Sequence, residues 1–139
     1  MSADVLTKAK KLVEETVVGH LATAEGEQPR VRPIAMRWVG ERELWFATHA
    51  ASRKIDQIKT DAAVEVCFVD PAWSHVRASG TASTTKNDAD RKKLFELIPD
   101  LAKHFDGPTD PKYILVKIGI ARVEYMGIGS VDYETHAFA

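Results

Sequence analysis

Six segments rich in branched and aromatic residues, most of them separated by short turns, constrain the fold of this 139-residue chain. Glu25-Gly26-Glu27 is one such turn, and residues 40–43 form another. Parallel strands would need long crossover connections, and the sequence has no GxGxxG or Walker motif that would accompany them. The sequence therefore predicts a mainly β fold, a six-stranded antiparallel barrel with flanking helices. The expected strands span residues 17–24, 28–39, 44–48, 63–69, 75–85 and 113–126.

Helices are expected at three places around these strands. Apolar residues at helical spacing predict an N-terminal helix that includes residues 5–13. Ser52 stands where it can cap a second helix over residues 53–59. Asn87 or Asp88 can cap a third helix that runs to Ile98.

Two further features concern the later part of the chain. Gly80 interrupts an expected strand, which predicts a bulge or a close approach by another segment. The tail beyond Gly127 is expected to be mobile or bound to a partner. The length of the chain fits one domain spanning residues 1–139.

Composition removes several classes of function. Nineteen basic and 20 acidic side chains give a net charge of −1, so bulk charge favours neither nucleic acid nor a membrane surface as partner. Cys67 is the lone cysteine, which rules out an intramolecular disulfide and favours a reducing, cytoplasmic setting. The sequence has no apolar run long enough to span a membrane, and its five histidines have no metal-binding spacing. We therefore expect no metal site.

Hydroxyls and cations gather where two expected strands end at the start of a helix. Arg32 lies in one strand, Thr48 ends another, and Ser52-Arg53-Lys54 begins the helix. A phosphate carries nearly two negative charges, and about two or three cations or several charge-assisted hydrogen bonds can remove it from water. The sequence therefore predicts a phosphate site. Taken alone, Arg53 and Lys54 would more often be solvated surface residues.

The order of these residues resembles the pyridoxamine 5′-phosphate oxidase-like FMN-binding split-barrel family. The resemblance covers roughly residues 17–125 and implies a six-stranded split barrel that holds FMN between the subunits of a homodimer. The motifs that carry the resemblance are Arg32-Pro33-Ile34-Ala35, Phe46-Ala47-Thr48, Ser52-Arg53-Lys54 and Gly80-Thr81-Ala82.

The resemblance also implies roles for individual residues. It assigns the FMN phosphate to Arg32, Arg53 and Lys54, with help from Thr48 and Ser52. It places the isoalloxazine ring against the backbone around Pro33, Ile34 and Ala35, with Ala47 nearby. His75 stands where the family often has a glutamine that reaches the flavin across the dimer interface, and Trp73, in the preceding loop, is a candidate flavin neighbour. Tryptophans on strands are more often core or interface residues.

The chain departs from true pyridoxamine phosphate oxidases at its C-terminal end. Those enzymes carry an arginine and a histidine there that bind substrate phosphate, whereas this chain ends in residues 131–139, VDYETHAFA. The length and tail resemble the general stress protein branch of the family instead. Oxidation of pyridoxamine phosphate is therefore not expected.

Three functions remain open on the sequence. The first is an FMN-dependent oxidoreductase, in which hydride or electrons pass between the cofactor and a small-molecule substrate in the dimer cleft. The sequence contains no GxSxG elbow, and Cys67 lies in an expected strand, so no side chain is assigned a catalytic role. The second is a non-catalytic flavin-binding or stress-response module. The third is a relative that uses the deazaflavin F420, which also bears a phosphate.

Overall fold

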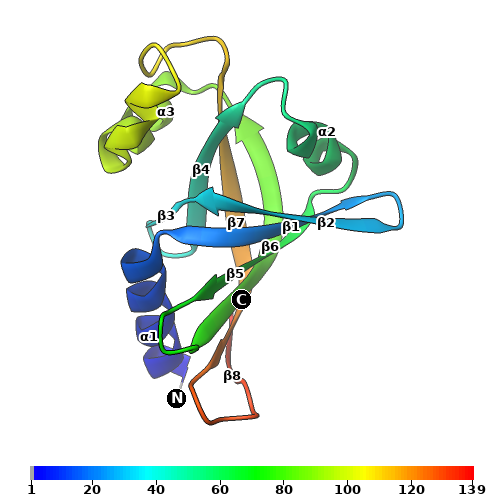
Figure 1. Ribbon diagram of the computed structural model, residues 1–139, viewed down its shortest axis with the longest axis vertical. Helices are drawn as coiled ribbons and strands as arrows, with labels where there is room; N and C mark the ends of the chain where they lie inside the picture. The colour runs from blue at the N-terminus through cyan, green and yellow to red at the C-terminus, as the bar shows by residue number, and fades with distance from the viewer. Residues whose placement is uncertain (1) are drawn as a thin grey trace.

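The computed structural model describes residues 2–139, with side chains from Asp4 onward (Figure 1). The helices are α1 (Ser2–Thr16), α2 (Arg53–Thr60) and α3 (Asp88–Leu97), with a short 3-10 helix, η1 (Pro99–Lys103). The strands are β1 (Val18–Glu25), β2 (Gln28–Ala35), β3 (Arg37–Val39), β4 (Glu43–His49), β5 (Ala63–Val69), β6 (His75–Thr85), β7 (Tyr113–Met126) and β8 (Glu134–Ala137). Within residues 2–139, no helix has both the length and the apolar character needed to cross a membrane.

The strands form a single antiparallel sheet that curls back on itself. Its order is β2-β1-β5-β6-β7-β4-β3, with β8 paired to β7. The two ends of this path, β2 and β3, are joined in the chain through Met36 alone. The sheet must therefore close into a barrel next to Met36. Away from Met36 the two edge strands separate, because β2 pairs with β1 whereas β3 pairs with β4. The mainly β, antiparallel split-barrel fold predicted from the sequence is confirmed.

Apolar side chains that alternate along the strands fill the interior of the barrel. Along β5, Val64, Val66 and Phe68 point inward and are buried, whereas the residues between them are more exposed. α1 closes one side of this core and α2 contributes two isoleucines to it. The inward-facing core includes Leu12, Leu21, Met36, Phe46, Ile55, Ile58, Val66, Phe68 and Ile118. A second cluster joins α3 and η1 to the outer faces of β4 and β7 through Trp45, Leu94, Leu101, Phe105, Tyr113 and Leu115.

Gly80 allows β6 and β7 to approach closely. The register between these strands shifts between Ser79 and Gly80, which marks a bulge. A Cβ atom added to Gly80 would lie 2.0 Å from the carbonyl oxygen of Gly119. The bulge and the close approach predicted from the sequence are therefore both present.

Residues 2–139 form eight strands where the sequence predicts six, for two local reasons. The strand expected over residues 28–39 is interrupted at Met36, whose fully buried side chain turns into the core while the chain passes from β2 to β3. The tail, expected to be mobile or partner-bound, instead forms β8. This strand pairs with Arg122–Tyr125 of β7, and Glu134 forms an ion pair with Lys8 of α1 at 3.1 Å.

Candidate functional site: a basic cluster at the start of helix α2

Lys54 is held by two hydroxyls at the start of α2. Its Nζ donates to the Oγ of Ser52 at 2.7 Å and to the Oγ1 of Thr48 at 2.9 Å. Ser52 occupies the N-cap position, as the sequence predicts, but its side chain makes no capping hydrogen bond. The predicted capping bond is therefore wrong, because this hydroxyl accepts from Lys54 instead. Thr48 is buried, so the ammonium is anchored at the end of a rigid strand.

Arg32 reaches the same region from β2. Its Nη1 donates to the Oγ1 of Thr23 at 2.7 Å and to the carbonyl oxygen of Leu21 at 3.3 Å. Its Nη2 donates to the Oε1 of Gln57 at 2.7 Å, and the Thr23 hydroxyl donates to that same Gln57 oxygen at 2.5 Å. Thr23 and Gln57 are buried, and they hold the Arg32 guanidinium from the buried side.

Sequence reasoning did not identify Thr23 and Gln57 as site residues. Both are polar side chains at inward-facing positions: Thr23 follows Leu21 on the buried face of β1, and Gln57 lies between the buried Ile55 and Ile58 on α2. Buried polar groups are normally hydrogen-bonded, so a polar residue at such a position was the available signal.

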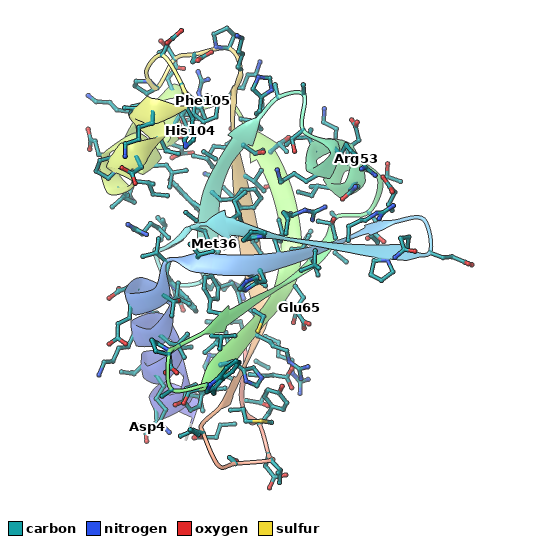
Figure 2. The ribbon with its side chains drawn as sticks, in the orientation of Figure 1. Asp4, Met36, Arg53, Glu65, His104 and Phe105 are labelled. Atoms are coloured by element: carbon teal, nitrogen blue, oxygen red, sulfur yellow. The ribbon has the colours of Figure 1, made fainter. Side chains whose placement is uncertain are left out.

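Arg53 lies at the outer edge of the cluster and is paired with a carboxylate. Its Nη2 contacts both oxygens of Glu25 at 3.1 Å, and Arg30 donates to Glu25 as well, at 2.9 Å. Hydrogen bonds from Arg53, Arg30 and Gln57 lower the pKa of Glu25 from 4.5 to about 2. The Arg53 side chain is 73% exposed, so this pair is accessible to solvent (Figure 2).

Within residues 2–139, neither of the two inner cations of the cluster, Arg32 and Lys54, is hydrogen-bonded to a carboxylate. Burial lowers the pKa of Arg32, the nearby positive charges of Arg53 and Arg30 lower it further, and the negative charge of Glu25 partly offsets this lowering. Burial also lowers the pKa of Lys54, and the charge of Arg32 adds to the shift. Among residues 2–139, the hydrogen bonds of Arg32 and Lys54 go to neutral oxygens. An anion bound here would relieve both the desolvation and the mutual repulsion of these groups.

The predicted ring-contacting residues of β2 border this cluster. Ile34 packs against the barrel core, Ala35 is half-buried and Pro33 is exposed on the outer face. Ala47 differs from them: its side chain projects from the face of β4 opposite Thr48, as strand alternation requires. It lines a hollow of about 320 Å³ with His49, Leu101, His104 and Phe105; the last two are labelled in Figure 2.

Trp73 and His75 lie elsewhere in the chain. Trp73 is in the β5–β6 turn, on the side of the molecule occupied by α1 and β8 and away from α2 (Figure 1). Trp73 is 78% exposed and its φ is 73°, a left-handed conformation that is uncommon for a bulky residue. The Nε2 of His75 lies 2.7 Å from the hydroxyl of Tyr133. A single chain therefore does not bring these two residues to the basic cluster.

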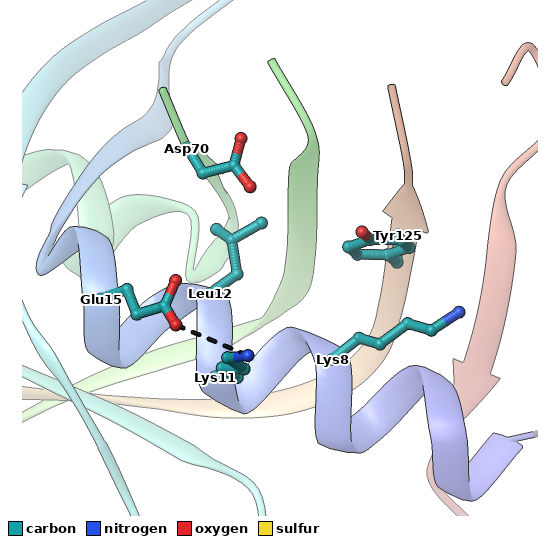
Figure 3. A pocket seen from close by; sticks show the side chains of 6 residues that line it. All are labelled: Lys8, Lys11, Leu12, Glu15, Asp70 and Tyr125. Carbon is teal, nitrogen blue, oxygen red and sulfur yellow. Dashed lines mark ion pairs between the residues drawn. The ribbon is translucent and has the colours of Figure 1, made fainter. Parts of the chain in front are cut away.

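A different pocket lies between α1 and the barrel (Figure 3). Its volume is about 230 Å³, and its lining includes Lys8, Lys11, Glu15, Asp70 and Tyr125. Its charged groups already have partners. Lys11 pairs with Glu15 at 3.9 Å, Lys8 pairs with a β8 glutamate, and the Oδ1 of Asp70 accepts two backbone N–H groups of its own turn. This pocket lacks the crowded, half-buried cations of the basic cluster.

Several solved structures have the same fold, and the names of two of them state different bound groups, FMN and heme. General stress protein 26 from Bacillus anthracis is 21% identical, with a TM-score of 0.81 and 97% of each chain covered. A pyridoxamine 5′-phosphate oxidase-related FMN-binding protein from Nostoc punctiforme is 18% identical, with a TM-score of 0.72, covering 99% of this chain and 94% of that one. A heme-binding protein from Mycobacterium smegmatis is 17% identical, with a TM-score of 0.79, covering 96% of this chain and 57% of that one. At these identities the likeness shows the fold alone.

The family is established by sequence. No match to a curated protein was found. The family model described as pyridoxamine 5′-phosphate oxidase like matches residues 4–130, which is most of the chain and includes the whole basic cluster. The chain therefore belongs to the pyridoxamine 5′-phosphate oxidase-like family, as its resemblance predicts.

Proposed function

We propose that this protein binds FMN, with the phosphate held by Arg32, Thr48, Ser52, Arg53 and Lys54. One observation carries the proposal: Arg32 and Lys54 are half-buried cations with lowered pKa values whose hydrogen bonds, within residues 2–139, go to neutral oxygens. Such a donor set fits a dianion, because it offers charge-assisted bonds from several directions. It also fits the family's cofactor.

Each group would contribute differently to binding. The Ser52 and Thr48 hydroxyls accept from Lys54 and hold its ammonium in place, so these groups would lose little freedom when an anion arrives, and the O–H of each hydroxyl could then donate to it. Arg53 would exchange its exposed bond to Glu25 for the phosphate. The ring would lie against the backbone around Pro33, Ile34 and Ala35 of β2, and of Ala47 only the backbone could lie near it, because the Ala47 side chain projects from the other face of β4. When bound, FMN supplies hydride or electron transfer, and the chain's own residues bind, orient and shield it.

We further propose that the active form is a homodimer in which Trp73 and His75 reach the FMN held by the partner subunit. The outer face of β1 and β2 carries exposed apolar side chains, including Val18 and Val31, which suits burial against a second copy. A mixing experiment tests the arrangement: an Arg53→Met/Lys54→Met chain is combined with a Trp73→Ala/His75→Ala chain. If the groups act across the interface, about a quarter of all sites regain wild-type FMN affinity after random exchange. No regain would show that they act within one chain.

Within this proposal, a cytoplasmic oxidoreductase acting on a small substrate is favoured over a non-catalytic flavin-binding or stress-response module. The protein, as a single domain of residues 1–139, would bind its substrate in the dimer cleft. Steady-state reduction of the purified flavoprotein by NADH or NADPH, with an added acceptor, separates the two functions. Sustained turnover supports the enzyme, whereas a bound but inert flavin supports the module.

Absorbance of the freshly purified protein identifies the bound group. FMN gives bands in the blue and near-ultraviolet and is the expected result. A deazaflavin spectrum would point to F420, whose phosphate suits the same cations. A heme spectrum would place the protein functionally beside the heme-binding neighbour and overturn the FMN assignment.

A further inference from the structure

Tyr133 of the C-terminal segment is bonded directly to His75. Its hydroxyl lies 2.7 Å from the Nε2 of the imidazole, and the two rings meet edge to face with centroids 5.5 Å apart. Within residues 2–139, the other ring nitrogen, Nδ1, has no hydrogen-bond partner. The imidazole is therefore held at one nitrogen and available to a ligand at the other.

A cation lies against the tyrosine ring. The guanidinium carbon of Arg77 is 4.1 Å from the Tyr133 ring centroid, and Arg77 is itself held by Glu124 at 3.1 Å. A positive charge over the ring face draws electron density from the phenol and makes its O–H a better hydrogen-bond donor. Arg77 thus favours the arrangement in which Tyr133 donates and the Nε2 of His75 accepts. An imidazole that accepts at Nε2 carries its proton on Nδ1.

The segment that carries Tyr133 is fastened on both sides. Before it, the backbone N–H of Ile128 donates to the Oγ of Ser74, the residue next to His75, at 3.2 Å. After it, β8 pairs with β7, and Glu134 binds Lys8. Tyr133 is consequently a fixed support and its orientation follows from the fold.

We propose that Tyr133 is a positioning residue that holds His75 as its Nδ1–H tautomer, so that His75 presents a directed N–H donor to a ligand's acceptor atom. The identity of that acceptor rests on the proposed function: it would be a carbonyl oxygen or ring nitrogen of an isoalloxazine. The tautomer itself follows from the contacts of this chain alone.

Nitrogen-15 NMR of the imidazole rings tests the proposal without cofactor. In the wild-type protein at about pH 8.5, where ordinary imidazoles are neutral, His75 should show a protonated Nδ1 and an unprotonated Nε2. Tyr133→Phe keeps the ring over Arg77 but removes the hydroxyl, so the protonated nitrogen should change or the two tautomers should mix. Tyr125→Phe is the matched control, because Tyr125 faces the pocket beside α1 and its variant should leave the His75 spectrum unchanged.

A second readout connects the tautomer to binding. Tyr133→Phe loses the neutral hydrogen bond that orients His75, so its dissociation constant for FMN should rise about 2- to 10-fold, whereas that of Tyr125→Phe should not change. A wild-type His75 protonated at Nε2, or a Tyr133→Phe spectrum identical to wild type, would overturn the proposal. If no variant binds FMN, the proposed function fails, while the NMR result still decides the tautomer.

Discussion

Lys54 and Arg53 are neighbours in sequence, yet the structure predicts very different contributions to FMN binding. Lys54 is half-buried and already arranged between the hydroxyls of Thr48 and Ser52. Loss of charged hydrogen bonds from such a position costs about 1.5 to 3 kcal/mol, so Lys54→Met should raise the FMN dissociation constant about 10- to 150-fold. Arg53 is mostly exposed and must leave Glu25, so Arg53→Met should cost about 0.5 to 1 kcal/mol, or about 2- to 5-fold.

The assay is a titration of apoprotein with FMN, followed by quenching of flavin fluorescence at fixed ionic strength. Lys59→Met is the matched control, because Lys59 is an exposed lysine in the last turn of the same helix. The Arg53→Ala/Lys54→Ala double variant should lose about 2 to 5 kcal/mol of binding free energy. If Lys54→Met binds FMN as tightly as Lys59→Met does, the reasoning that places the phosphate beside the α2 hydroxyls is refuted.

Three further predictions concern the fold and its charges. Gly80→Ala should lower the free energy of unfolding by about 1 to 3 kcal/mol or prevent folding, since its Cβ would meet a backbone oxygen, whereas a denaturant titration of Gly119→Ala, whose Cβ has room, should show a smaller change. The pKa of Glu25 falls from 4.5 to about 2 on folding, so the stability that its ion pairs contribute is complete above pH 4.5 and is lost as the pH falls towards 2. In the Glu25→Gln variant the free energy of unfolding should depend less on pH in that window, and a parallel acid titration of both proteins checks it. Tyr113→Phe should cost about 1 kcal/mol, because the buried hydroxyl donates to the carbonyl oxygen of Arg91 at 2.9 Å, and thermal unfolding monitored by circular dichroism should show the lower melting temperature.

Local patterns predicted much of this fold because they have local causes. Alternation along β5 follows directly from the two faces of a strand, and Gly80 indicates its bulge because only glycine tolerates the approach of β7. β8 could not be predicted in the same way. Its stability comes from pairing with β7 and from the contact of Glu134 with Lys8, which is 126 positions away in the sequence.

The candidate site also contains residues that the local sequence could identify and residues that only the folded structure reveals. The motif order identified Arg32 and Lys54 because each carries its own charge, and the structure brings both to the start of α2. It did not reveal Thr23 or Gln57, which matter only because folding places them under the Arg32 guanidinium. It also predicted a helix-capping bond for Ser52, whereas the ammonium two residues later takes that hydroxyl.

Calorimetric titration of the purified apoprotein with FMN and, separately, with riboflavin tests the central claim most directly, since the two ligands share a ring system and differ by the phosphate. If the basic cluster binds the phosphate, FMN should bind at least about 100-fold more tightly than riboflavin, and the difference should shrink in Lys54→Met. Equal affinities for the two ligands in the wild-type protein would contradict the account.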